Sequence, residues 1–247
     1  MSFSLAALIP CYNHGDTVEA VVQALQSKAL DVIIVNDGSN QMTTQTLREI
    51  KQRCNIHLLE LEQNSGKGGA VMAGLSHLHQ LGYSHAVQVD ADGQHDLATL
   101  TELIKQAKLA PNAVISGKPV YGDDVPKGRL YGRYLTHVCV WLETLSLQIK
   151  DSMCGFRVYP LAQVQQLLNR TELGTRMDFD IEILVRLYWQ GLNIKHVDTP
   201  VSYPEDGISH FNAIDDNIKI SWLHTRLICG MLPRIPKLLL RKFTHGS

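Results

Sequence analysis

The sequence predicts an α/β fold in which a mostly parallel sheet is flanked by helices. Short apolar runs alternate with amphipathic stretches through the first half of the 247 residues, a pattern typical of strands joined by crossover helices. Polar residues with distinctive chemistry follow several of these runs, and parallel sheets bind ligands at the carboxyl ends of their strands. With 45% hydrophobic and 19% charged residues, the composition suits a globular protein with a sizeable core.

The strands of the first half are predicted from short apolar runs. Residues 5–9 and 32–35 are continuous runs, as expected for strands that are covered on both faces. Further strands are expected at 56–61, 86–89 and 114–116. Helices are expected between them at 16–27, 43–53, 69–81 and 97–108. The first has Val18, Val21, Val22 and Leu25 on one face.

The second half has a less regular pattern. Helices are expected at 130–147, 179–188 and 214–231, and an extended segment at 194–203. Loops are expected at 118–127, 151–157 and 206–212, where Gly, Pro and Asp interrupt the apolar pattern. Pro233 and Pro236 should end or kink the last helix.

Two carboxylates, Asp90 and Asp92, follow the fourth predicted strand directly. Acidic side chains at the end of a buried strand repel each other and lose hydration, so a compensating charge is expected. With the amide oxygen of Gln94 they form a hard oxygen-ligand set that suits Mg²⁺ or Mn²⁺. Because such ions take further ligands from phosphates, the motif favours a phosphate-bearing substrate. A plain polar turn is the alternative interpretation.

Two further motifs suit nucleotide chemistry. In the segment 36–39, Asp37 can accept a hydrogen bond from a base or ribose, and Gly38 permits a sharp turn. In 64–69, glycines precede a helix start and Lys67 adds a charge. This second segment is not a Walker A loop, because Leu61 and Gly68 stand where Gly and Ser or Thr are needed. A surface turn and a bare loop are the respective alternatives.

Taken in order, these residues resemble the family-2 glycosyltransferases with the GT-A fold, and most closely the polyprenyl-phosphate sugar transferase branch. The resemblance covers about residues 4–205. Its motifs are Pro-Cys-Tyr-Asn at 10–13, Val-Asn-Asp-Gly-Ser at 35–39, Asn-Ser-Gly-Lys-Gly at 64–68, Val-Asp-Ala-Asp-Gly-Gln-His at 89–95 and Asp-Ser-Met-Cys-Gly-Phe-Arg at 151–157.

The resemblance implies a set of site residues. Implied nucleotide contacts are Pro10, Tyr12, Asn13, Asp37, Lys67 and Asp90; the implied metal and diphosphate site is Asp90, Asp92 and Gln94. Three positions depart from the family pattern: His14 replaces a Glu, Asn36 replaces an Asp, and Lys118 replaces an Arg. Lysine keeps the charge but loses the bidentate fork, so Lys118 would hold the acceptor's anionic group differently.

Candidate catalytic carboxylates lie in 177–183, which resembles the acidic helix start on the family's acceptor side. A phosphate acceptor needs no base near neutral pH, because its second pKa is about 6, whereas a hydroxyl acceptor needs one. Asp178 suits a helix N-cap and Glu182 either acts in catalysis or pairs with Arg186, which leaves Asp180 as the candidate base. Arg157 either holds an acceptor phosphate or forms a structural ion pair.

The segment 218–247 contains six Lys or Arg and no Asp or Glu. Its basic and apolar residues interleave over 218–242, which suits an amphipathic helix on an anionic membrane surface; packing on its own domain or on a partner is the alternative. The five cysteines are scattered without a C-x-x-C pair, which favours a reducing cytosol. We found no signal-peptide pattern and no 18-residue apolar run. The expected location is therefore cytoplasmic, with peripheral contact at the inner membrane face.

The predicted function is an inverting, metal-dependent glycosyl transfer from a nucleotide-diphosphate sugar to a lipid-linked or lipid-like acceptor. The expected organisation is a GT-A domain over 1–212, with a nucleotide half (1–118) and an acceptor half (119–212), followed by the basic tail 213–247. A non-catalytic nucleotide-sugar-binding subunit and a nucleotidyltransferase are alternatives, although 10–14 lacks the Gly-rich basic loop that the latter needs. Nucleic acid is not expected as a partner, because the basic segment is short and no binding motif is present.

Overall fold

A seven-stranded sheet forms the centre of the protein within the residues that the computed structural model describes, namely 3–93, 96–121, 127–200 and 215–244. The strands are β1 (Leu5–Cys11), β2 (Asp31–Asp37), β3 (His57–Leu61), β4 (His85–Gln88), β5 (Val114–Val120), β6 (Arg157–Pro160) and β7 (Ile194–Pro200). Their order is β3-β2-β1-β4-β6-β5-β7. Neighbouring strands are parallel except that β6 runs antiparallel to β4 and β5, which confirms the predicted mostly parallel sheet.

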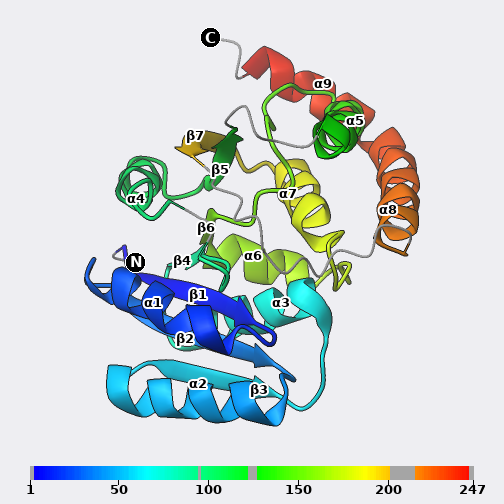
Figure 1. Ribbon diagram of the computed structural model, residues 1–247. Helices are drawn as coiled ribbons and strands as arrows, with labels where there is room; N and C mark the ends of the chain where they lie inside the picture. The colour runs from blue at the N-terminus through cyan, green and yellow to red at the C-terminus, as the bar shows by residue number, and fades with distance from the viewer. Residues whose placement is uncertain (1–2, 94–95, 122–126, 201–214, 245–247) are drawn as a thin grey trace.

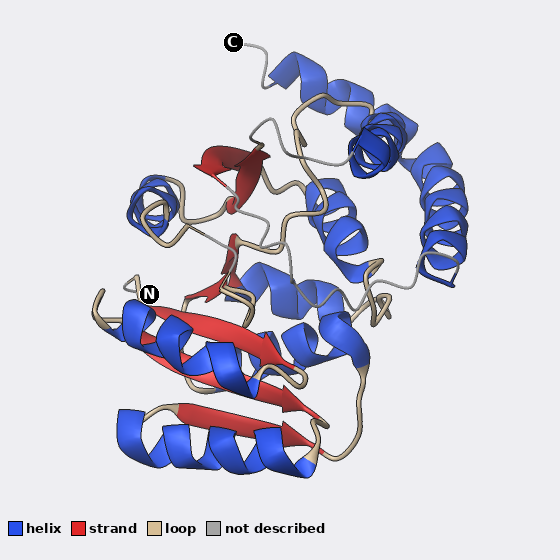
Figure 2. Cartoon of the chain, viewed as in Figure 1, coloured by secondary structure: helices blue, strands red, loops and turns tan. Residues whose placement is uncertain are grey.

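Helices cover both faces of the sheet (Figures 1 and 2). They are α1 (Gly15–Gln26), α2 (Gln41–Cys54), α3 (Gly66–Gln80), α4 (Leu100–Leu109), α5 (Lys127–Thr144), α6 (Leu161–Leu168), α7 (Phe179–Gln190), α8 (Asp215–Met231) and α9 (Ile235–Thr244). Helices α1, α2 and α4 share one hydrophobic core with the sheet, and α3, α6 and α7 share the other. Helices α5 and α8 pack on each other and on α7.

The inner strands are buried on both faces, as continuous apolar runs require. In β1, Leu8 belongs to the core under α3 and α7, while its neighbour Ile9 belongs to the core under α1 and α2. In β2, Ile33 and Ile34 alternate in the same way. Gly74 lets α3 approach closely, because a Cβ at this position would overlap the Leu8 side chain.

Two elements differ from the sequence prediction. The first is β6: it begins at the end of the predicted loop 151–157 and lies inside the sheet between β4 and β5. The second is α6, into which β6 leads directly.

The expected interruption of the last helix is confirmed. Pro233 lies in a 3-10 turn (Leu232–Arg234), and α9 follows with Pro236 as its second residue.

The sheet topology brings several loops to one edge. Cys11 pairs with Asn36 in the parallel register of β1 and β2, and Leu8 pairs with Gln88 in that of β1 and β4. The chain therefore leaves β1, β2 and β4 side by side, and the motifs at 10–13, 36–39 and 90–92 meet at this edge.

Candidate active site

The loops after β1 and β2 are joined by hydrogen bonds. The Asn13 N–H donates to Ser39 Oγ over 3.1 Å, and the Asn40 N–H donates to Asn13 Oδ1 over 2.9 Å. Asn13 has a φ of 60°, in the left-handed region that asparagine tolerates better than most residues. Pro10 and Tyr12, the other predicted nucleotide contacts here, are partly buried next to this pair of loops.

Asp37 connects the end of β2 to the start of α3. Its side chain is nearly buried, with 2% of the residue exposed, and Oδ1 accepts hydrogen bonds from both the N–H and the Oγ of Ser65, each over 2.7 Å. Gly38 has a φ of +64°, and a Cβ there would lie 2.5 Å from the backbone nitrogen of Asn64. A base or ribose contact by Asp37 stays a prediction.

The glycines around Lys67 have a packing role. A Cβ at Gly68 would overlap the Phe179 side chain at the start of α7. The Gly69 N–H donates to the carbonyl of Thr175 over 3.0 Å. The glycines therefore allow α3 to begin against the segment that leads into α7, which brings the motif at 64–68 next to the acidic segment 177–183.

Lys67 lies between two carboxylates at this junction. Its Nζ is 3.0 Å from Asp90 Oδ2 and 3.4 Å from Asp180 Oδ2. Burial alone would lower the pKa of Lys67, but the charges of Asp180 and Asp90 outweigh this and hold the pKa above its ordinary value. Lys67 is therefore a charged ammonium that bridges two of the predicted site residues.

The turn that carries Asp90 and Asp92 is held on α1, because Thr17 Oγ1 donates to the Ala91 carbonyl over 2.7 Å. Gln94 lies outside the described residues, as does His95. Within the described ranges no cluster of three His, Cys, Asp or Glu side chains could hold a metal ion. Two adjacent carboxylates nevertheless fit Mg²⁺ or Mn²⁺, since these ions take remaining ligands from water and substrate phosphates.

The three carboxylates at the start of α7 have different surroundings. Asp180 is 4% exposed and faces Lys67 and Arg157. Glu182 is fully buried; it pairs with Arg186 over 2.6 Å and accepts the Gly174 N–H over 2.7 Å. This geometry favours the structural alternative for Glu182. Asp178 precedes α7 without capping it, since its Oδ1 accepts the Arg176 N–H instead.

Arg157 is fully buried, with 0% of the residue exposed. Its Nη1 donates to the carbonyl of Asp180 over 2.7 Å and its Nη2 to the carbonyl of Ser152 over 2.8 Å. Nη1 also lies 3.7 Å from Asp180 Oδ1. In this arrangement the guanidinium has no surface open to a ligand, so the geometry favours the structural alternative for Arg157.

Lys118 lies on β5, in the strand pair β5–β7. The parallel register places it opposite Asp198, and its Nζ is 3.2 Å from Asp198 Oδ1. The Lys118 side chain is 40% exposed. A contact between Lys118 and the acceptor's anionic group stays a prediction.

One buried network was missed by sequence reasoning. Asp151 accepts hydrogen bonds from Arg133, at 2.5 and 2.8 Å, and from the Cys154 N–H, while His137 Nε2 lies 3.3 Å away. Burial alone would raise the pKa of Asp151, but His137 and Arg133 hold it below the ordinary value. Asp151 is the first residue of the motif at 151–157, but nothing in the sequence indicates that it pairs with Arg133 and His137 of α5.

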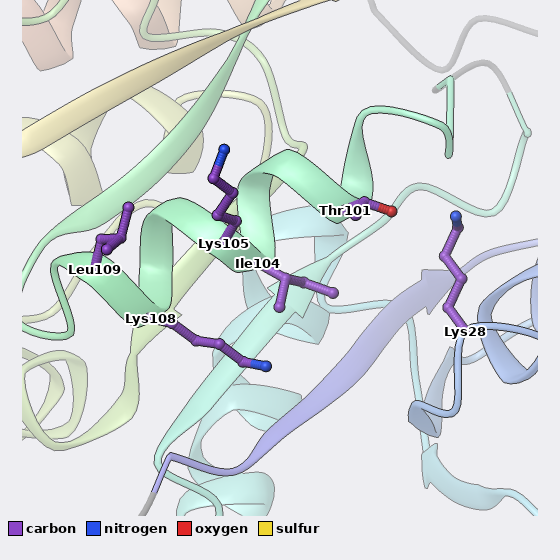
Figure 3. Close-up of a pocket in the computed structure, with 6 residues that line it drawn as sticks. All are labelled: Lys28, Thr101, Ile104, Lys105, Lys108 and Leu109. Carbon is purple, nitrogen blue, oxygen red and sulfur yellow. The ribbon is translucent and has the colours of Figure 1, made fainter.

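A surface hollow also lies along α4 (Figure 3). Its lining residues are Lys28, Thr101, Ile104, Lys105, Lys108 and Leu109. None of these residues belongs to the motifs of the sequence analysis, and the hollow forms no part of the candidate site.

The mostly parallel sheet with helices on both faces is that of the GT-A class of folds, as the sequence predicted. A model of glycosyl transferase family 2 matches residues 6–167. The chain belongs to this family, and the protein is a glycosyltransferase.

Individual relatives agree with this assignment. A UDP-N-acetylglucosamine–dolichyl-phosphate N-acetylglucosaminyltransferase of Methanococcus voltae is 36% identical over 230 residues, which cover 86% of this chain and 91% of the relative. A dolichyl-phosphate β-glucosyltransferase of Dictyostelium discoideum is 26% identical over 239 residues, covering 88% of this chain and 71% of the relative.

A solved structure supports the fold. Glucosyl-3-phosphoglycerate synthase from Mycobacterium tuberculosis, crystallised with Mn²⁺ and UDP-glucose, matches with a TM-score of 0.65 and 16% identity. The match covers 94% of this chain and 79% of the synthase chain.

Proposed function

We propose that the protein transfers a sugar from a nucleoside-diphosphate sugar to the phosphate group of a polyprenyl-type lipid, with inversion at the anomeric carbon. The names of its relatives carry this proposal. The Methanococcus voltae protein, 36% identical over 86% of the chain, is named for a UDP-sugar donor and a dolichyl-phosphate acceptor. The Dictyostelium discoideum relative is also named for dolichyl phosphate.

The residues at the carboxyl edge of the sheet suit the donor. Asp90 and Asp92 would hold a divalent cation, which when bound neutralises the charge of the leaving diphosphate. Lys67 supplies a positive charge from the first turn of α3. Asp37 lies at the end of β2, with Oδ1 held by Ser65, on the side where the base or ribose is expected.

A phosphate acceptor suits the surroundings of Asp180. This carboxylate faces the ammonium of Lys67 and the guanidinium of Arg157. A phosphate oxygen is already ionised near neutral pH, because its second pKa is about 6, so the transfer does not require Asp180 to take a proton. For a hydroxyl acceptor Asp180 would be the candidate base.

The acceptor can be tested with two lipids that differ only in the phosphate. UDP- and GDP-sugars would be incubated with the protein, Mn²⁺, and either a polyprenyl phosphate or the matched polyprenol, and the products identified by mass spectrometry. We expect a glycosylated lipid from the phosphate alone. A product formed only from the polyprenol would contradict the proposed acceptor, and no lipid product with any donor would contradict the proposed transfer.

The lipid acceptor implies a lipid-facing surface, which we place on α5 and α8. These helices pack on each other (Figure 1). They expose large apolar side chains: Leu135, Val138 and Leu142 on α5, and Ile218 and Trp222 on α8. Among the described helices, none is both long and apolar enough to span a bilayer.

A double substitution, Ile218→Ser with Trp222→Ser, tests this surface. These side chains are 63% and 62% exposed, so the fold should tolerate the change. We expect weaker co-sedimentation with anionic vesicles, while Leu109→Ser, which alters a 69% exposed side chain on α4, should have no effect. Unchanged co-sedimentation of the double variant would remove α8 from the lipid-facing surface.

A further inference from the structure

Lys67 joins the donor side of the site to the acceptor side. Its Nζ lies 3.0 Å from Asp90 Oδ2 and 3.4 Å from Asp180 Oδ2. Asp90 is also a carboxylate that would hold the divalent cation. An ammonium and a divalent cation repel each other strongly at such short range. In the arrangement seen here the ammonium would therefore weaken the binding of a cation at Asp90.

The two carboxylate partners of the Lys67 ammonium differ in how accessible they are. On the inner side a Cβ at Gly155 would lie only 2.9 Å from Lys67 Nζ and 2.8 Å from Gln88 Nε2, so the ammonium lies where a larger residue at position 155 would not fit. Asp180 is nearly buried, with 5% of its side chain exposed. In contrast, 21% of the Lys67 side chain and 23% of the Asp90 side chain are exposed. A diphosphate would therefore reach the ammonium from the side of Asp90, which is the more accessible of its two partners.

We propose that Lys67 is an exchangeable counter-ion: it neutralises Asp90 while the donor is absent and transfers to the diphosphate when nucleotide and divalent cation bind. This inference rests on the proposed function of the site. Lysine suits the role because it is a compact charge on a flexible four-carbon stem. A diphosphate carries more negative charge than one carboxylate, so it attracts the ammonium more strongly.

Cooperative binding of nucleotide and cation follows from this exchange. Without nucleotide the cation must displace Lys67 from Asp90, and its affinity is reduced. With nucleotide the ammonium has another partner, and the oxygen of Asp90 becomes available. Coupling between two ligands is reciprocal, so the cation should strengthen nucleotide binding by the same factor.

The test measures Mn²⁺ affinity directly, without any turnover. Free Mn²⁺ would be followed by electron paramagnetic resonance during titration of the wild-type protein, Lys67→Met and Lys105→Met, each with and without UDP or GDP. The Lys105→Met control makes the same change in net charge on α4, where the Lys105 side chain is 65% exposed. Circular dichroism and a thermal melt would confirm that each variant is folded.

In the wild type, nucleotide should lower the Kd for Mn²⁺ by a factor of about 5 to 150, the usual range of coupling between sites. In Lys67→Met the Kd without nucleotide should fall about tenfold, because one neighbouring positive charge is gone, and the effect of nucleotide should shrink. Lys105→Met should behave as the wild type.

Three results would overturn the inference. The first is a Lys67→Met protein whose Mn²⁺ affinity without nucleotide is unchanged or weaker. The second, which needs no variant, is a wild-type protein that binds Mn²⁺ equally with and without a nucleotide that it binds. The third is a wild-type protein that binds neither Mn²⁺ nor any nucleotide, which would overturn the proposed function as well.

If Lys67→Met does not fold, Lys67→Gln serves in its place, since it keeps a hydrogen-bond donor toward Asp90 without the charge.

Discussion

The fully buried Arg157 offers a decisive test between a structural and a ligand-binding role. The substitution Arg157→Met keeps much of the side-chain length but removes every donor. The carbonyls of Ser152 and Asp180 would then lose partners at 2.8 and 2.7 Å, and Asp180 Oδ1 would lose a cation at 3.7 Å.

The expected destabilisation can be estimated from these contacts. Each buried carbonyl left without a donor costs about 1–3 kcal/mol, and breaking a buried ion pair by removing one partner costs about 3–5 kcal/mol. The two terms at Asp180 overlap, while the Ser152 carbonyl adds its own, so we expect a loss of at least about 3–5 kcal/mol in the free energy of unfolding. This is a large share of the stability of about 5–15 kcal/mol that is usual for a domain.

Urea unfolding followed by circular dichroism would measure this loss. Arg48→Met is the matched control, because the Arg48 side chain is 57% exposed and pairs with Glu60 at the surface; its loss should be much smaller than that of Arg157→Met, because exposed ion pairs contribute little to stability. If Arg157→Met lost less than about 1 kcal/mol while the KM for the acceptor rose, the structural role would be refuted and acceptor binding supported.

Two further outcomes are expected. Gly38→Ala should destabilise the protein by more than the roughly 1–2 kcal/mol that an alanine in the left-handed conformation costs, because its Cβ would also clash with the backbone of Asn64. Gly82→Ala is the control: its φ is +88° and the space around the Cβ is open, so only the backbone cost should appear. Equal losses in the free energy of unfolding of the two variants would contradict the clash. Burial lowers the pKa of His196 from 6.5 to about 4. The stability that neutral His196 contributes is therefore present above pH 6.5 and is lost as the pH falls toward 4. The free energy of unfolding should fall by about 2 kcal/mol between pH 6.5 and 5. His196→Gln should show a smaller loss over this interval in urea titrations, and an identical pH dependence would count against this role for His196.

The parts of the fold that the sequence revealed are those specified by local patterns. Strands β1, β2 and β4 are apolar runs that end at polar motifs, and their parallel pairing follows from the helices between them. Strand β6 was missed because its four residues include Arg157 and Pro160, and charged residues and proline are rare inside a sheet. Arg157 is accommodated only through backbone carbonyls supplied by distant segments.

The candidate site shows the same limit. The motifs at the strand ends could be located from the sequence, because the carboxyl ends of parallel strands meet at one edge. The pairing of Lys67 with Asp180 could not, because it depends on how closely α3 packs against the start of α7. The sequence predicts that Gly68 belongs to a phosphate-binding loop, and the structure shows that it also permits this packing.

Helix α9 holds the end of another helix, α7, which carries a candidate site residue at its opposite end. Arg241 donates to the carbonyls of Tyr188 and Leu192, and Lys237 to that of Trp189. These bonds clamp the trailing end of α7, whose leading end carries Asp180. Removing α9 would therefore leave Asp180 itself in place but remove the hydrogen bonds that hold the C-terminal end of α7, the helix that carries it.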